Sequence, residues 1–120
     1  CLPPRSFVVR MLLARLPAGA CIPLHVDKGA SLRFVHRLHV PVLTHPHVPF
    51  TVGEETVCLR DGEVWEINNC RAHGVSNDGD SARVHLIMDW ATPALVQQFL
   101  AQQFATGVIQ PLTDSQVAST

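Results

Sequence analysis

Short segments in which apolar and polar positions alternate follow one another along most of the chain. Alternation with a period of two is typical of strands buried on one face, and short aliphatic runs are typical of strands buried on both faces. Residues 7–16 can also be interpreted as a helix, but their β-branched content favours a strand. We therefore predict strands at residues 7–16, 21–26, 33–43, 50–52, 55–60, 63–68 and 83–90.

Glycine, proline and aspartate mark the connections between these segments. Asp61-Gly62 predicts a hairpin turn between the strands on either side of it. Residues 69–75 are expected to form a loop that carries His73, and residues 76–82 are expected to form a tight polar turn.

The pattern changes after residue 90, where apolar residues recur at helical spacing. Thr92 is a suitable N-cap and Pro93 suits the first helical position, so we predict a helix over residues 92–106. Gly107 is expected to end this helix.

We expect one domain over residues 1–120, with an extended lead-in at 1–6, a β-barrel core at 7–90 and a flexible tail at 110–120. The strands are too closely spaced for crossover helices, so the sheets should be mostly antiparallel. The predicted fold is mainly β: a double-stranded β-helix, also called a jelly roll and cupin-like, with the C-terminal helix packed outside.

Of the 120 residues, 47% are apolar and only 16% are charged, and the formal net charge is -1. This composition offers no basic face for nucleic acid and no apolar run of membrane-spanning length. The four cysteines lack CxxC spacing, so we interpret them as ordinary thiols and expect a reducing, cytoplasmic location. The composition does not indicate an oligomeric state. Its unusual feature is the presence of seven histidines in a chain of this length.

Two histidines and one aspartate are the candidate metal ligands. On a strand, the spacing of His25 and Asp27 points both side chains to one face, although a surface histidine bonded to an aspartate is the alternative. His73 could supply a third ligand from across the barrel, or it could be a solvated loop histidine. Two imidazoles and one carboxylate are the ligand set of non-haem iron sites with open positions. If residues 76–82 form a hairpin, Arg83 lies near His73 on a neighbouring strand.

Two Arg-x-His pairs, Arg37 with His39 and Arg83 with His85, lie on strand faces opposite to apolar positions. A barrel interior that holds an anionic ligand explains both pairs, because a guanidinium group binds a carboxylate through paired hydrogen bonds. The alternatives are that these faces are exposed to solvent, or that Arg83 forms a salt bridge with an aspartate of residues 76–82.

Five further polar residues lie outside this group. His36 falls on the apolar face of its strand and is interpreted as a structural histidine. His45 and His47 could form a second metal site in a loop, which is the less favoured interpretation. Asn68 and Asn69 could either bond to the backbone near His73 or reach a ligand.

The placed residues resemble the aspartyl/asparaginyl β-hydroxylase family over about residues 10–90. The most specific segments are RLHVPV at 37–42, VWEINN at 64–69 and HGVSNDGDSARVHLIMDW at 73–90. The residues that carry the resemblance are His25, Asp27, Arg37, His39, Trp65, His73, Asn77, Arg83 and Asp89.

The resemblance implies an Fe(II)- and 2-oxoglutarate-dependent dioxygenase that uses dioxygen and has a double-stranded β-helix fold. It implies His25 and His73 as iron ligands, and Arg83 as the anchor of the distal 2-oxoglutarate carboxylate. Arg37 and His39 would line the same pocket. The animal enzyme that names the family has Gly in place of the carboxylate ligand, so this chain, with an aspartate there, resembles the branch that has all three ligands.

The expected substrate is an amino acid, a peptide side chain or a related small molecule. Two other functions remain open: a cupin-like metalloprotein that does not use 2-oxoglutarate, and a non-catalytic jelly-roll binding module. The chain begins with Cys1 and is short for the family, so it could be a fragment that lacks either part of the N-terminal sheet or a lid over the substrate.

Overall fold

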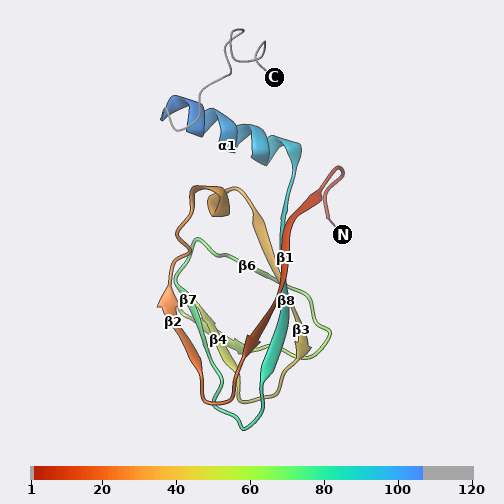
Figure 1. Ribbon diagram of the computed structural model, residues 1–120, viewed down its shortest axis with the longest axis vertical. Helices are drawn as coiled ribbons and strands as arrows, with labels where there is room; N and C mark the ends of the chain where they lie inside the picture. Colours follow the sequence, from red (N-terminus) through yellow and green to blue (C-terminus); the bar gives the residue numbers. More distant parts are fainter. Residues whose placement is uncertain (1, 107–120) are drawn as a thin grey trace, which may run out of the picture.

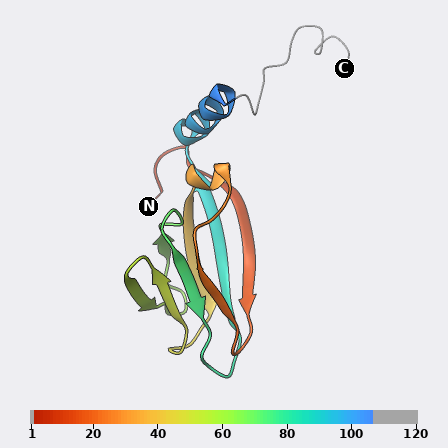
Figure 2. The same ribbon diagram turned by 90° about the vertical axis from the view of Figure 1, so that its left-hand side faces the viewer.

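The computed structural model describes residues 2–106, so the expectations for Gly107 and the tail at 110–120 lie outside the described residues. The described chain forms two four-stranded sheets that face each other, with a helix at one end (Figure 1 and Figure 2). Every strand pairing is antiparallel, which confirms the predicted mainly β fold with a C-terminal helix. Within the described residues, no helix is long and apolar enough to cross a membrane.

The two sheets interleave along the sequence. The first contains, in spatial order, β1 (Phe7–Leu16), β8 (Arg83–Ala91), β3 (His36–Leu43) and β6 (Trp65–Ile67). The second contains β2 (Cys21–His25), β7 (His73–Ser76), β4 (Pro49–Val52) and β5 (Glu55–Cys58). The short 3-10 helix η1 (Ala30–Arg33) separates β2 from β3, and α1 (Pro93–Ala105) follows β8.

Local hydrogen bonds define both ends of the described chain. Within the predicted lead-in, the Ser6 N–H donates to the Pro3 carbonyl at 3.1 Å and closes a turn. At the other end, Thr92 is the N-cap of α1, and its hydroxyl accepts a hydrogen bond from the Leu95 N–H at 3.4 Å. Pro93 occupies the first helical position, as predicted, because its missing N–H would have had no partner there.

The predicted hairpin at Asp61-Gly62 is wrong, because the strands on either side belong to different sheets. The Asp61 carboxylate accepts a hydrogen bond from the Thr44 N–H at 2.7 Å, and the Gly62 N–H donates to the Pro41 carbonyl at 2.9 Å. These bonds attach the turn to β3 and direct the chain from one sheet to the other. A hairpin forms instead between β4 and β5, where Gly53 has the positive φ, +61°, that its turn requires.

Two further expectations about the region around His73 are wrong. Residues 69–75 are not a loop throughout, because His73 begins β7, which pairs with both β2 and β4. Residues 76–82 do not close a hairpin, because β7 and β8 lie in different sheets, and His73 and Arg83 are therefore not on neighbouring strands. Asn77 is fully buried and donates to two backbone carbonyls at 3.0 and 2.9 Å, which fixes this crossing.

The interior of the barrel is apolar in one part and polar in the other. The apolar cluster contains Leu16, Val48, Phe50, Ile67 and Val75. Most of the buried polar side chains come from β3, β7 and β8 or the residue after β7: Arg37, His39, His73, Asn77, Arg83, His85 and Asp89. Burying so many polar groups costs free energy unless they form hydrogen bonds with one another or with a ligand. Those that have no protein partner are therefore candidates for binding a ligand.

Candidate metal centre

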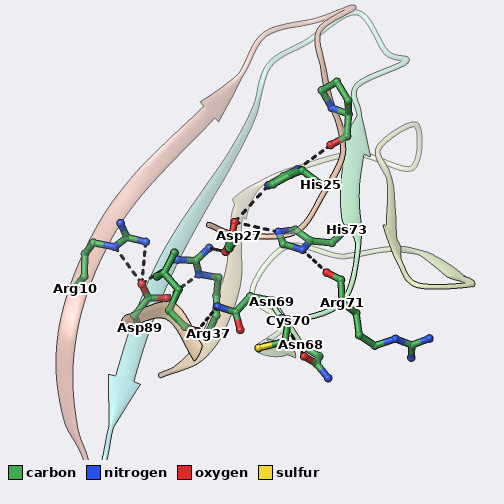
Figure 3. A network of polar contacts seen from close by, with 12 residues as sticks. Arg10, His25, Asp27, Arg37, Asn68, Asn69, Cys70, Arg71, His73 and Asp89 are labelled. Carbon is green, nitrogen blue, oxygen red and sulfur yellow. Dashed lines mark hydrogen bonds and ion pairs between the residues drawn. The ribbon is translucent and has the colours of Figure 1, made fainter. Parts of the chain in front are cut away.

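His25 and His73 lie opposite each other on β2 and β7, with ring centroids 4.5 Å apart (Figure 3). Gly74 lets the two strands approach at this point. A Cβ atom on Gly74 would lie 2.9 Å from the Ile22 carbonyl oxygen and 3.0 Å from the Leu24 nitrogen, which is closer than real Cβ contacts. A glycine next to His73 is therefore part of what brings the two imidazoles together.

Both imidazoles are oriented by backbone carbonyls. The Nδ1 atom of His25 lies 2.8 Å from the Pro23 carbonyl oxygen, and that of His73 lies 2.9 Å from the Arg71 carbonyl oxygen. A carbonyl oxygen only accepts hydrogen bonds, so each Nδ1 carries a proton, and the neutral form of each ring then has its free lone pair on Nε2. The two Nε2 atoms face one oxygen of Asp27, Oδ1, at 3.4 and 3.6 Å (Figure 3).

Asp27 completes the group, although it does not lie on a strand. The predicted strand 21–26 ends at His25, so strand geometry alone does not place the carboxylate. Its second oxygen, Oδ2, accepts a hydrogen bond from Nη1 of Arg37, which leaves Oδ1 free. The ligand atoms of His25, Asp27 and His73 all lie within 4.8 Å of one another, so the three residues could hold a metal ion.

Arg37 is committed to two carboxylates. Besides Asp27, it donates to Asp89 from Nε at 2.7 Å and from Nη2 at 3.0 Å. Arg10 also contacts Asp89, from Nε at 3.0 Å and from Nη2 at 2.9 Å. Burial opposes ionisation of Asp89, but the contacts with Arg37 and Arg10 outweigh it and lower the pKa of the carboxyl. Arg37 was expected to line an anion pocket, but its guanidinium group already has these partners.

Arg83 is in the opposite situation. Its side chain is 2% exposed, its Nε atom has no hydrogen-bond partner, and no ion pair to it is found within residues 2–106. Neither Asp78 nor Asp80 forms an ion pair with Arg83 in the described chain, so the alternative of a salt bridge from the 76–82 turn is not found. Burial lowers the pKa of Arg83 to about 10, which still leaves the group charged at neutral pH. A buried cation without a counter-ion carries a desolvation cost that only a partner of opposite charge offsets.

His39 and His85 lie between these two arginines. In the pairing of β3 with β8, His39 lies opposite Ile87. This pair follows the Arg37–Asp89 pair, and His85 comes two residues further along, opposite Pro41. The two Nδ1 atoms are 3.3 Å apart, and the Nε2 atom of His85 is buried without a partner in the described chain. Burial lowers the pKa of each histidine to about 3, with the Arg83 charge adding to the effect in both cases. Both are therefore neutral at physiological pH.

A cavity of about 690 Å³ opens beside the metal-ligand group. It is lined by His25 and Asp27, by the basic residues Lys28 and Arg33, and by Gln102 of α1. The helix therefore contributes to the wall of the space in front of the candidate centre.

The sequence left the roles of Asn68 and Asn69 open, and the structure shows that both bond to the backbone. Asn68 accepts a hydrogen bond from the Cys70 N–H at 3.1 Å, and Asn69 donates to the Leu32 carbonyl at 2.9 Å. Asn69 thereby attaches the segment before β7 to η1 (Figure 3).

The remaining histidines lie apart from the candidate centre. His36 stacks on Trp90, with ring centroids 4.3 Å apart, and contacts the Glu66 carboxylate. His45 and His47 have ring centroids 6.2 Å apart, and within the described residues they belong to no group of three ligands. The expected structural role of His36 agrees with its stacking contact.

Comparison with known families decides the classification. The sequence profile of the aspartyl/asparaginyl β-hydroxylases matches residues 4–93. The chain belongs to the aspartyl/asparaginyl β-hydroxylase family. No curated protein sequence matches it. Family membership, the cupin-like fold and the His25–Asp27–His73 group together indicate a cupin-type metalloenzyme of the hydroxylase or oxygenase class.

Solved structures confirm the fold of this β-hydroxylase family member. The non-heme monooxygenase ThoJ, in its nickel complex, has a TM-score of 0.62 and 20% identity, over 75% of this chain and 46% of ThoJ. A predicted oxalate decarboxylase from Thermotoga maritima has a TM-score of 0.53 and 18% identity, over 68% of this chain and 65% of that protein. A cupin domain from Bordetella pertussis has a TM-score of 0.53 and 19% identity, over 72% of this chain and 92% of that domain.

Several contacts of the candidate centre were not predicted from the sequence. The carbonyls of Pro23 and Arg71 each precede their histidine by two residues, a spacing that has meaning only once the backbone is known. Asp89 entered only through the family resemblance. It shares the alternate positions of Arg83 and His85 along β8, so the period of two could have placed it on the inner face.

The two neutral histidines predict a loss of stability in acid. The folded state keeps His39 and His85 unprotonated down to a pKa of about 3, whereas the unfolded chain protonates near 6.5. Their contribution is therefore complete above pH 6.5 and is lost as the pH falls toward 3, at up to about 1.4 kcal/mol per pH unit for each. Urea denaturation at pH 7.5 and pH 5 should show a smaller pH effect in His85→Gln than in the wild type, and equal pH effects would contradict this origin.

The close approach of β2 and β7 predicts a specific effect of Gly74→Ala. The added methyl group would push β2 away, separate the imidazoles and lower affinity for Mn²⁺ by at least about tenfold, with a stability loss of about 1–3 kcal/mol. Gly62→Ala is the matched control. Its φ of +78° makes alanine unfavourable there, but a Cβ would meet nothing within 4 Å. Calorimetric titration with Mn²⁺ should find wild-type affinity in Gly62→Ala only; unchanged affinity in Gly74→Ala would contradict the role of the close approach.

Proposed function

We propose that this protein is an Fe(II)- and 2-oxoglutarate-dependent dioxygenase that hydroxylates an amino acid, a peptide side chain or a related small molecule. The observation that carries the proposal is the coexistence of two sites in one barrel interior. One is the three-ligand group of His25, Asp27 and His73, and the other is the buried guanidinium group of Arg83, which lacks a counter-ion.

The donor set suits Fe(II). Nε2 of His25, Nε2 of His73 and Oδ1 of Asp27 would hold the ion, and two imidazoles with one carboxylate leave coordination positions open. When bound, the iron supplies the activation of dioxygen, with 2-oxoglutarate as co-reductant: the cosubstrate becomes succinate and carbon dioxide while the substrate gains a hydroxyl group. The carbonyls of Pro23 and Arg71 accept from Nδ1 of each ring, so each neutral imidazole would offer Nε2 to the ion.

The polar interior suits 2-oxoglutarate. Arg83 would bind its distal carboxylate, and this would supply the missing counter-ion. His39 and His85 are neutral there, so they can line the cosubstrate without adding charge, and the orphan Nε2 of His85 could gain a hydrogen-bond partner. Phe50 packs beside both histidines and helps to exclude water from the same region.

The substrate would enter through the cavity beside the metal ligands. Its wall contains Lys28 and Arg33, and we expect these basic side chains to favour substrates that carry a carboxylate. Gln102 of α1 provides an uncharged hydrogen-bonding group on the same wall. This lining favours amino acids and acidic peptides over neutral small molecules.

A cupin-like metalloprotein that does not use 2-oxoglutarate is the second candidate function. The similarity in fold to the predicted oxalate decarboxylase from Thermotoga maritima favours it. It requires the same three metal ligands, but it gives no role to the buried charge of Arg83.

Succinate formation distinguishes the two candidates. Purified protein with Fe(II), ascorbate, 2-oxoglutarate and air should release succinate, and amino acids or acidic peptides that are substrates should accelerate the release. The matched control is His73→Ala under the same conditions, which should release none. A protein that binds metal but forms no succinate with any pool of amino acids or peptides would favour the second candidate.

A further inference from the structure

The position of Asp27 depends on side chains rather than on the strand next to it. Asp27 lies beyond the end of β2. Among the described turns and loops, its N–H and carbonyl groups form no hydrogen bond with another backbone group. Yet its carboxylate is directed at both imidazoles, with Oδ1 3.4 Å from Nε2 of His25 and 3.6 Å from Nε2 of His73. The contact that accounts for this direction is the hydrogen bond from Arg37 to Oδ2.

Arg37 is itself held by a row of side chains across three strands. The register places Arg10 of β1 opposite Asp89 of β8, and Asp89 opposite Arg37 of β3. Asp89 is 2% exposed and receives hydrogen bonds from both arginines, so both of its oxygens act as acceptors. Figure 3 shows this row leading from Arg10 at the edge strand to Asp27 at the candidate centre.

We propose that Arg37, Asp89 and Arg10 are positioning residues for the metal centre, which act through Asp27. Arg37 binds one oxygen of Asp27 and leaves the other free for the ion, and Asp89 keeps Arg37 in that arrangement. This inference rests on the proposed metal centre and goes beyond it, because it assigns a role to three residues that do not contact the ion.

The charge and geometry of the row explain why Asp89 is needed. Two guanidinium groups and two carboxylates balance in the intact row. In Asp89→Asn, Arg37 would lose one of the two oxygens that accept from Nε and Nη2, together with the negative charge that holds its guanidinium group. The guanidinium group could then bind both oxygens of Asp27, as arginine does with an isolated carboxylate. Oδ1 would be withdrawn from the imidazoles, and an unbalanced positive charge would remain near the ion.

A double-mutant cycle on metal affinity tests this inference without using catalysis. Calorimetric titration with Mn²⁺ should find affinity about 10- to 100-fold lower in Asp89→Asn than in the wild type. The same substitution should change affinity by less than about twofold in an Asp27→Gly background, which retains both imidazoles. Glu66→Gln is the control, because it removes a carboxylate that contacts His36 elsewhere on the same sheet.

The possible outcomes separate the two proposals. Equal losses in both backgrounds, or no loss in the wild-type background, would overturn the positioning role and leave the proposed function intact. A wild-type protein that binds no Mn²⁺ would refute the proposed function and this inference together. If Asp89→Asn does not fold, as judged by urea denaturation, Arg10→Gln replaces it: Arg10 is half exposed, and its loss should give a smaller effect that again disappears in Asp27→Gly.

Discussion

Replacing His73 with alanine is expected to abolish metal binding at the proposed centre and, with it, succinate formation. His73 supplies one of the three grouped ligand atoms, and the Arg71 carbonyl orients its ring. Loss of groups that only support a metal ligand already costs about 10- to 100-fold in affinity, so loss of a ligand itself should cost at least about 100-fold. Calorimetric titration with Mn²⁺ measures the affinity, and detection of succinate measures the turnover.

His36→Ala is the matched control for this substitution. His36 lies on β3 of the same barrel, but it stacks on Trp90 and contacts Glu66 instead of the ligand group. The His36→Ala protein should bind Mn²⁺ with the affinity of the wild type. Wild-type affinity in His73→Ala would mean that the metal binds elsewhere, and it would contradict the proposed centre.

Arg83→Met is expected to raise the concentration of 2-oxoglutarate that the protein requires for turnover. The same substitution should not lower the free energy of unfolding of the ligand-free protein. A hydrogen-bonded ion pair with a carboxylate contributes about 1.5–3 kcal/mol, so the concentration of 2-oxoglutarate for half-maximal turnover should rise about 10- to 100-fold. Methionine fills similar space without a charge, and removing a buried, unpaired cation should leave the free energy of unfolding equal or higher. Succinate kinetics and urea denaturation measure the two effects.

Arg15→Met provides the comparison, because Arg15 is an exposed arginine on β1 next to the same part of β8. Arg15→Met should leave both the 2-oxoglutarate requirement and the free energy of unfolding close to their wild-type values. An Arg83→Met protein with an unchanged requirement for 2-oxoglutarate would remove the main support for this cosubstrate. A large loss of stability would instead indicate that Arg83 has a structural partner.

The sequence pattern predicted every strand of the described chain except β7, which was expected to lie in a loop, and it grouped the residues that share a strand face. Arg37 and His39 share one face of β3, and Arg83 and His85 share one face of β8, as the alternation implied. The structure buries both pairs, which rules out the alternative of solvent-exposed faces. The helix after Thr92 was also predictable, because its capping signals are local. Strand alternation and helix capping depend on residues that are adjacent in the sequence, so both can be predicted without knowledge of the fold.

The connections between the sheets could not be predicted in the same way. Asp61-Gly62 does turn the chain, but a turn signal does not specify whether the next strand pairs with the previous one or with a strand from the other sheet. That choice depends on long-range contacts, such as the bond from Gly62 to Pro41. The same limit applies to Asp27, whose spacing from His25 suggested a shared strand face. Asp27 instead lies beyond the end of β2, and its carboxylate accepts a hydrogen bond from Arg37 of the other sheet.

The central claim is that one metal ion and 2-oxoglutarate bind together inside this barrel, and a crystal structure of the protein soaked anaerobically with Fe(II) and 2-oxoglutarate tests it most directly. Anomalous scattering at the iron edge should show one strong peak among Nε2 of His25, Oδ1 of Asp27 and Nε2 of His73. Electron density for 2-oxoglutarate should extend from that peak to the guanidinium group of Arg83. An iron peak away from these three residues, or cosubstrate density that does not reach Arg83, would contradict the account.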